Sequence, residues 1–318
     1  MSTYVKKEDD TLIESDTEVV KVETNNLKKL LDITKTFTHF GVSTIPNREI
    51  YISKILQYSD TENVVNMRYG FSISYSDYKK YNEKYYYPRL RSLILLNTSN
   101  VVDMSYMFYN VTLDSGILPL FDTSKVTDMS YMFAGLKARN NQNPPIIPKY
   151  NTSNVTNMYC MFAGCSLFSC ILPNPFFDTS NVTNMAYMFS TEIPGEISIN
   201  NGYPEIPIFN TTNVTNINDI FSGNVNLLII PAYDFSNVTT AISAFYRCNR
   251  LEQFLPTGLK VSFNLSASTK FTREALVVVL NNLGTPTSTQ TLTLGSTNLA
   301  KLTEEDIAIA TEKNWTLK

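Results

Sequence analysis

Apolar and polar positions follow one pattern that returns seven times along this chain. Each clear copy begins with a threonine, carries a valine and two methionines or similar apolar residues, and ends with a phenylalanine. The copies span residues 61–71 (interrupted), 98–108, 123–133, 152–162, 179–189, 211–221 and 235–245 (divergent). The valines of successive copies, from Val64 to Val238, are 37, 25, 29, 27, 32 and 24 residues apart. Self-similarity at such a period is typical of a solenoid.

The hydrophobic spacing within one unit predicts a strand, a polar turn, a short helix and a return. The apolar run Ile117–Phe121 contains Pro119, which suits a short strand in which the proline nitrogen needs no partner. Asp122–Ser124 has the short polar side chains that favour a turn. The apolar residues of 126–133 then fall at offsets 0, 3, 6 and 7, which fit one face of a two-turn helix with Gly135 at its C-cap. Equivalent strand runs occur at 146–148, 171–173, 206–208 and 229–231.

Stacked copies would place the repeated valine, methionine and phenylalanine positions in columns through the interior. Thioethers at such spacing fill irregular gaps in a core, so we interpret the methionines as packing residues and not as metal or redox ligands. The predicted repeat core consists of Val101, Met104, Met107, Phe108, Val126, Met129, Met132, Phe133, Val155, Met158, Met161, Phe162, Val182, Met185, Met188 and Phe189.

The repeated phrase closely resembles the BspA-like leucine-rich-repeat surface proteins, whose units contain a phrase similar to F-D-T-S-N-V-T-D-M-S-x-M-F-x-G-C. The match is carried by residues 150–165 and 177–189, and it extends over about 61 to 250. The resemblance implies a leucine-rich-repeat solenoid used in adhesion or recognition, with no catalytic residues. Members of that family are usually exported.

These patterns together predict an α/β repeat solenoid, a right-handed leucine-rich-repeat-like coil of short parallel strands and short helices with a cap at each end. We expect a flexible or partner-bound arm over 1–24, an N-terminal cap over 25–60, about seven repeats over 61–255 and an α/β cap over 256–318 with one leucine-rich-repeat-like unit. Within the last segment, alternation predicts strands at 261–265 and 291–294 and periodicity predicts a helix over 272–283. Thr303–Asp306 should cap a final helix ending near Asn314.

Composition excludes several function classes. A net charge of −3, with only 17% charged residues, does not suit a nucleic-acid-binding protein. Residues 1–10 lack the apolar segment of a secretory signal, and no run of 18 apolar residues predicts membrane insertion. The Asn-Val-Thr triplets at Asn154, Asn181, Asn213 and Asn237 match a glycosylation sequon, but without a signal we interpret them as turn chemistry of the repeat.

No motif indicates an enzyme, a metal or a cofactor. Cys160, Cys165 and Cys170 are five residues apart, unlike a C-x2-C zinc pattern, and we expect these cysteines and Cys248 to be buried, with a disulfide between neighbouring coils left open. The single histidine, His39, has no evident nucleophilic partner and is most simply part of the cap.

One insertion stands out as a candidate binding surface. It separates the first two copies and is rich in tyrosine, which gives large contact area at low entropic cost and is common, with arginine, at binding hot spots. Its candidate residues are Tyr75, Tyr78, Tyr81, Tyr85, Tyr86, Tyr87 and Arg89. Insertions at 136–145 and 190–205 are further candidates, while the alternative is a surface loop folded back on the cap.

Three functions fit the sequence. The first is a phage virion protein, a head or tail fibre or decoration component exposed on the particle. Its arm would bind other virion proteins, and its solenoid would bind a host surface protein or glycan. This hypothesis draws on a second resemblance, that of residues 294–317 to the endings of repeat proteins encoded by phages of gut bacteria. The second is a bacterial cell-surface adhesin, and the third is a cytosolic scaffold. A homo-oligomer stays open in each case.

Overall fold

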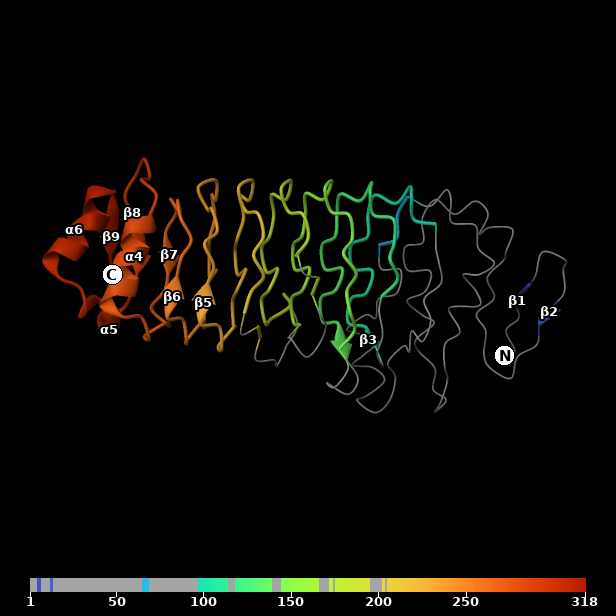
Figure 1. The fold of residues 1–318 in the computed structure, drawn as a ribbon, viewed down its shortest axis with the longest axis horizontal. Coiled ribbons are helices and arrows are strands. Elements are labelled where there is room, and N and C mark those ends of the chain that lie inside the picture. The colour runs from blue at the N-terminus through green and yellow to red at the C-terminus, as the bar shows by residue number, and fades with distance from the viewer. Residues whose placement is uncertain are drawn as a thin grey trace. The chain divides into compact units, whose positions relative to one another are not determined.

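A computed structural model describes residues 5–6, 12–13, 65–68, 97–113, 118–138, 144–165, 172–173, 175–194, 202–203 and 205–318. Several residues singled out above lie outside this part of the chain, namely the tyrosine-rich insertion with Tyr75, Tyr78, Tyr81, Tyr85, Tyr86, Tyr87 and Arg89, the predicted cap over 25–60 with His39, and Cys170. The chain divides into two compact units, and Figure 1 draws its described residues in colour from the N-terminus to the C-terminus. Unit 1 comprises Met1–Asn154 with Phe168–Asn174, and unit 2 comprises Val155–Leu167 with Pro175–Lys318.

Successive copies of the repeat are joined in parallel by backbone hydrogen bonds. In unit 1, the N–H groups of Met104, Tyr106 and Phe108 donate to the next copy over 2.8–3.0 Å. In unit 2, Met185, Tyr187 and Phe189 do the same over 2.8–3.0 Å, with acceptors on Asn216, Asn218 and Ile220. Every second N–H therefore points to the neighbouring copy, and isolated parallel bridges such as Asp103–Asp128 and Asn184–Asn216 mark the start of each run.

The short helix expected in each unit is absent from the described repeats, so that expectation is wrong. Residues 129–135 form consecutive tight turns, with φ of 57° at Tyr131 and 67° at Gly135. The N–H groups not used between copies close these turns locally, as Met132 donates to Met129 over 3.2 Å. A helix would need every N–H for its own ladder, whereas here half of them bind the next copy. Two successive turns nevertheless bury the residues at offsets 0, 3, 6 and 7 of the unit on one side, namely Val126, Met129, Met132 and Phe133.

The interior is a column of apolar side chains in each unit. All sixteen repeat positions named above as core, from Val101 to Phe189, have an exposed fraction of 0%. Phenylalanines of successive copies stack, at 5.7 Å between ring centroids for Phe108 and Phe133 in unit 1 and 5.7 Å for Phe162 and Phe189 in unit 2. Fully burying one such side chain stabilises the fold by about 1.5–3 kcal/mol, so each copy depends on its neighbours for most of its stability.

Strands within the described repeats are few and short. Parallel pairs form between β3 (Thr112–Leu113) and β4 (Lys137–Ala138) and between β5 (Ile229–Ile230) and β6 (Gln253–Phe254). Of the apolar runs expected as strands, only β5 is one among the described residues. Proline does not distinguish these runs, because Pro231 directly follows β5 just as Pro119 and Pro148 follow the apolar residues of their own runs. Near the N-terminus, β1 (Val5–Lys6) and β2 (Leu12–Ile13) pair antiparallel where the sequence predicted only an arm.

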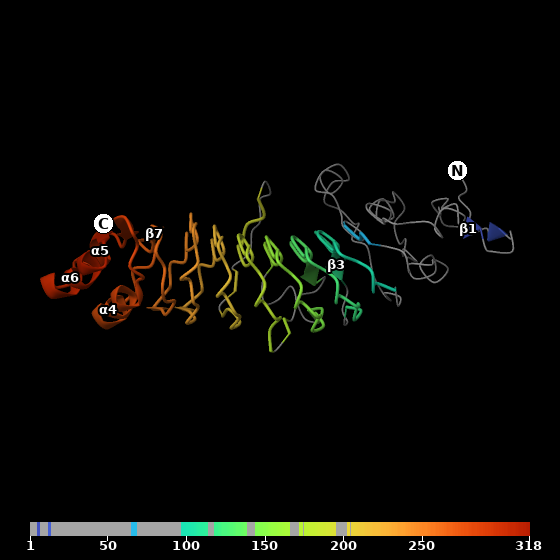
Figure 2. The same cartoon turned by 90° about the horizontal axis from the view of Figure 1, so that it is seen from above.

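The C-terminal part of unit 2 is α/β. Strands β7 (Phe263–Asn264), β8 (Gln290–Thr293) and β9 (Trp315–Leu317) form a parallel sheet, and helices α4 (Arg273–Asn282), α5 (Ser296–Leu299) and α6 (Glu304–Glu312) accompany it. Figure 2 shows the three helices gathered at this end of the unit. The strands predicted near 261–265 and 291–294, the helix near 272–283 and the capped last helix are confirmed; α5 and β9 were not anticipated.

Candidate recognition surface

The polar residues that recur in every clear copy form hydrogen bonds with the backbone. Aspartate or asparagine before each Thr-Ser pair accepts from a backbone N–H two residues on, as Asp178 Oδ1 does from Ser180 over 2.9 Å. The buried threonine between them bridges copies: Thr123 Oγ1 donates to Asn151 over 2.8 Å in unit 1, and Thr211 Oγ1 donates to Asp234 over 2.7 Å in unit 2. These groups are therefore part of the scaffold and not of a binding site.

The asparagines of the Asn-Val-Thr triplets are likewise bonded between copies. Asn154 Nδ2 donates to the Ser124 carbonyl over 2.7 Å in unit 1, and Asn213 and Asn237 donate to Ser180 and Thr212 over 2.6 and 2.7 Å in unit 2. The sequence indicated that these asparagines stabilise a turn within one copy. The structure shows that they also form hydrogen bonds from one copy to the preceding copy.

The residues that differ between copies lie together on the turns, which we call the turn face. It consists of the two residues between the paired Met (or equivalent) core positions and the two residues after the core phenylalanine. In unit 2 the exposed or half-buried members of this set are Tyr159, Tyr187, Asn218, Asp219, Ile242, Ser243, Tyr246 and Arg247. The remaining members are buried and do not contribute to the surface, namely Cys160, Ala163, Gly164, Ala186, Ser190, Thr191, Ser222 and Gly223. Positions on one scaffold that tolerate tyrosine, aspartate, serine or arginine are those available for recognition.

In unit 1 the turn face carries an aromatic cluster. The rings of Tyr106 and Tyr131 stack with centroids 4.2 Å apart, and Tyr109 meets both edge-on at 5.4 and 6.0 Å. The guanidinium carbon of Arg68 lies 5.2 Å from the Tyr106 centroid, within cation–π range. Because their faces cover one another, these rings mainly reinforce the stack.

In unit 2 three residues of the turn face, Tyr187, Asp219 and Arg247, form an acid–tyrosine patch together with the adjoining Glu192. Partial burial and, after it, the neighbouring Asp219 carboxylate raise the pKa of Tyr187 to about 12. Desolvation likewise raises the pKa of Asp219, and the neighbouring hydroxyl groups of Tyr187 and Ser222 partly oppose this shift. Arg247 Nη1 lies 3.7 Å from Glu192 Oε1, with side-chain exposures of 55% and 51%.

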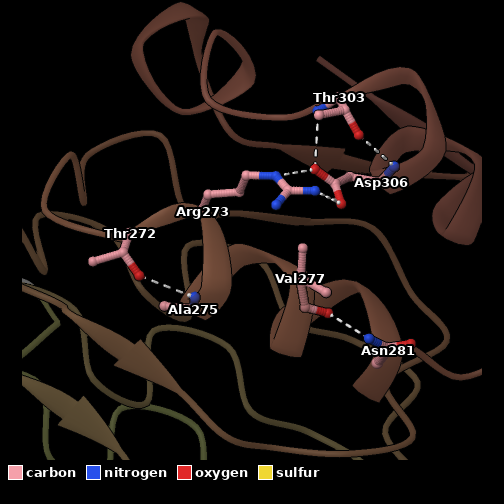
Figure 3. Close-up of polar contacts among 7 residues, drawn as sticks. All are labelled: Thr272, Arg273, Ala275, Val277, Asn281, Thr303 and Asp306. Carbon is pink, nitrogen blue, oxygen red and sulfur yellow. Dashed lines mark hydrogen bonds and ion pairs between the residues drawn. The ribbon is translucent and has the colours of Figure 1, made fainter.

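A second polar cluster of unit 2, formed by Arg273, Thr303 and Asp306, is structural (Figure 3). Arg273 binds both carboxylate oxygens of Asp306 over 2.7 and 2.8 Å, and Asp306 forms a capping box with Thr303 at the start of α6. Asp306 is only 5% exposed. The Thr303 N–H and then the Arg273 guanidinium hold the pKa of Asp306 below its usual value. This bidentate pair ties α4 to α6, and Arg273 occupies both carboxylate oxygens of Asp306.

The cysteines of the described residues have no catalytic environment. Cys160, Cys165 and Cys248 are fully buried. Burial raises the pKa of Cys248 to about 12, and its Sγ donates to the Phe221 carbonyl over 3.1 Å, so this thiol does not provide a thiolate at neutral pH.

No group of histidine, cysteine and acidic side chains able to hold a metal occurs in the part of the chain that the structure describes. None of the helices described there is long and apolar enough to cross a bilayer.

Sequence reasoning missed the acid–tyrosine patch. Its residues come from three copies, and none differs from an ordinary surface residue when taken alone. A usable signal was present in the comparison of copies, because Tyr106, Tyr131 and Tyr187 recur at one position that becomes Asp219 in the next copy. The candidates predicted between Tyr75 and Arg89 are outside the described residues and stay predictions.

Comparison with known families gives one match. Residues 16–142, 90–191 and 138–257 each match the profile of a family described as "Mycoplasma protein of unknown function, DUF285". The three overlapping matches together cover well over half of the 318 residues. No curated protein and no solved structure is significantly similar to the chain.

Proposed function

This chain belongs to the DUF285 family of Mycoplasma proteins of unknown function, and we propose that it is a non-enzymatic recognition protein built as a leucine-rich-repeat solenoid. One observation carries the proposal: the constant positions of the repeat are used for the core, the turns and the bonds between copies, while the variable positions gather on the turn face. This separation of constant from variable positions is typical of a scaffold that presents a variable surface to a partner. Because that surface carries no activated nucleophile among the described residues, we infer that it binds a partner and does not catalyse a reaction.

Parallel register supports the solenoid. Within unit 2 the same phrase position pairs from copy to copy, in the bridges Asn157–Asn184, Asn184–Asn216 and Asn216–Thr240. Within unit 1 it pairs in Asn66–Asp103 and Asp103–Asp128. A chain that continued this register through both units would be a single coil, in which each repeat contacts mainly its neighbours.

The setting that we propose is the outer surface of a phage virion. The support is the resemblance of residues 294–317 to endings of repeat proteins encoded by phages of gut bacteria. The solenoid would contact a host surface protein or glycan, and residues 1–24 would bind other virion proteins. Mass spectrometry of purified particles tests this setting: the chain is expected among the structural proteins, and its absence from the particles would refute it.

A matched deletion tests the role of the arm. Removing residues 1–24 should abolish incorporation into particles, while the unfolding transition of the purified chain stays within a few degrees of that of the full chain. Incorporation at the full-length level would show that other residues anchor the protein.

A second candidate is a bacterial cell-surface adhesin. It is favoured by the family description, which names a cellular bacterium, and by the resemblance to BspA-like surface proteins. Antibody labelling of intact, uninfected cells separates the two: surface label without phage production supports the adhesin, and label confined to infected cells or particles supports the virion protein. Signal only inside uninfected cells would count for a scaffold.

A further inference from the structure

We propose that Tyr106 and Tyr131 of unit 1 form an oxidative modification site, at which a one-electron oxidant couples the two phenol rings into dityrosine. The product is a covalent link between neighbouring copies of the repeat. This inference concerns unit 1 alone and does not depend on the recognition function proposed above. It starts from the geometry of the two rings, whose centroids are 4.2 Å apart and whose planes are 15° from parallel.

These two rings are closer and more nearly parallel than the other tyrosine pairs of the described residues. Tyr109 meets Tyr106 and Tyr131 edge-on, at centroid distances of 5.4 and 6.0 Å and interplanar angles of 62° and 76°. Tyr159 and Tyr187 of unit 2 are 5.7 Å apart at 62°. Coupling joins two ring carbons that lie next to the hydroxyls, so rings that are already stacked need the smallest movement to react.

The backbone of the repeat fixes this approach. Tyr106 and Tyr131 occupy the same repeat position in consecutive copies, and both have positive φ, of 59° and 57°. The N–H of Tyr106 donates over 2.8 Å to the carbonyl of Ser130, the residue before Tyr131. The two segments are therefore held at the spacing of a parallel ladder, about 4.8 Å. Groups held in this way react with each other faster than with groups on another molecule.

The coupling is a two-electron oxidation of the pair. Both tyrosines are half-buried, so a small oxidant can reach them. Each loses one electron and its phenolic proton and becomes a phenoxyl radical. The radicals join through a carbon–carbon bond between positions ortho to the oxygens, and the hydrogens of the joined carbons move to the oxygens and restore both hydroxyls. The chain loses two electrons and two protons in all, which an oxidant of the peroxidase or persulfate class accepts.

The test oxidises the purified full chain, at low concentration, with persulfate and a photoexcited ruthenium complex, which takes single electrons from tyrosine. Trypsin cuts after Lys125, so a link between Tyr106 and Tyr131 joins two peptides that are otherwise separate. Mass spectrometry of the monomer should find these peptides joined, with a mass two hydrogen atoms below their sum. The oxidised monomer should also show dityrosine fluorescence.

Substitutions assign the link to its two rings. Tyr106→Phe and Tyr131→Phe should each abolish the joined peptide, because phenylalanine forms no phenoxyl radical. Tyr109→Phe should keep it, since that ring lies edge-on. Tyr246→Phe is the matched control: it removes a tyrosine of unit 2 that is 57% exposed, and the joined peptide should form as in the parent.

A link between copies also closes a loop and so limits the freedom of the unfolded chain. The unfolding temperature of the linked monomer should therefore exceed that of Tyr131→Phe treated with the same oxidant.

The proposal is overturned if the monomer of the parent gives no joined peptide, if the link occurs only in dimers, or if it persists in Tyr106→Phe. The first two outcomes need no variant, so they decide the matter even if a substitution lowers stability. Loss of the joined peptide in Tyr109→Phe would assign the link to that ring and would equally refute the site at Tyr106.

Discussion

Each described copy from residue 98 onward places a non-glycine residue on a backbone with positive φ at one recurring position, and Asn110 and Arg247 have positive φ as well, two residues after the core phenylalanine. The recurring position lies just before the second core methionine or its equivalent, and φ there is 59° at Tyr187, 52° at Asp219 and 53° at Ser243. This conformation costs a residue other than glycine about 1–2 kcal/mol. It persists because the N–H of the same residue reaches the next copy, as Asp219 N donates to Ile242 over 2.9 Å.

Relief of this strain is measurable at Ser243, which is exposed. Ser243→Gly removes the steric cost and adds a smaller entropic one, so the free energy of unfolding should rise by about 0.5–1 kcal/mol in urea denaturation. Ile242→Gly is the control: its residue has no positive φ, so the same measurement should show a loss of about 1 kcal/mol. Destabilisation of equal size in both variants would contradict the strain argument.

The buried threonine of each copy gives a second residue-scale prediction. Thr211 is 3% exposed and donates across copies over 2.7 Å. Thr211→Val leaves the Asp234 carbonyl without this donor, which should lower the free energy of unfolding by about 1–3 kcal/mol. Thr215→Val, at an exposed threonine that donates to Thr183 over 3.2 Å, should change it by less than about 0.5 kcal/mol because water can replace the bond. Similar losses for both would show that burial does not matter here.

Single residues of the scaffold were predictable, whereas those of the candidate site were not. Burial of Met129 and Met132 follows from their recurrence in every clear copy, and the turn at Asp122 follows from its short acceptor side chain. The pairing of Tyr187 with Asp219 depends on which copies become neighbours and which turn position points outwards. The sequence of a single copy shows neither which copies are neighbours nor which turn position points outwards.

At the scale of elements, the repeat is a series of turns connected sideways, and within the described residues the helices lie at the end of unit 2. The pattern at 126–133 suited a helix because offsets of 0, 3, 6 and 7 fit 3.6 residues per turn. Two tight turns in succession produce the same burial, and the tertiary bonds between copies decide between them. The elements after residue 259 were predictable because they have caps and ordinary periodicity, as at Thr272 and Thr303.

The start of α6 gives a prediction on pH. Asp306 has a pKa below its usual value of 3.8 in the folded chain, so its contribution to stability is present above that value and is lost as the pH falls through the lower, folded pKa. The free energy of unfolding should therefore drop more steeply between roughly pH 5 and pH 2 in the parent than in Asp306→Asn.

The matched control for this titration is Glu312→Gln, which removes an exposed carboxylate at the opposite end of α6. It should keep the steep acid limb of the parent, because the bonds from Thr303 and Arg273 remain. An acid limb of Asp306→Asn that coincides with the parent's would show that the pair with Arg273 does not contribute to stability.

At the scale of the whole molecule, two units each consist of stacked copies with a buried aromatic column. If the register continues through both units, the chain is an elongated coil. Its radius of gyration in solution scattering should then clearly exceed the ~20 Å expected for a compact domain of this length. A value near ~20 Å would contradict the solenoid while leaving the repeats within each unit intact.

The central claim is that the constant residues of the repeat form the scaffold and that the turn face of unit 2 binds the host surface. The most direct test measures retention of the labelled, purified chain on intact gut bacteria by flow cytometry. The variant with Asp219→Asn and Arg247→Gln is compared with a control that carries Glu205→Gln and Glu252→Gln, two exposed acids of the same unit. We predict that the control is retained as the parent is and that the patch variant loses most of its retention, with unfolding temperatures within a few degrees. Equal retention of both variants would contradict the account.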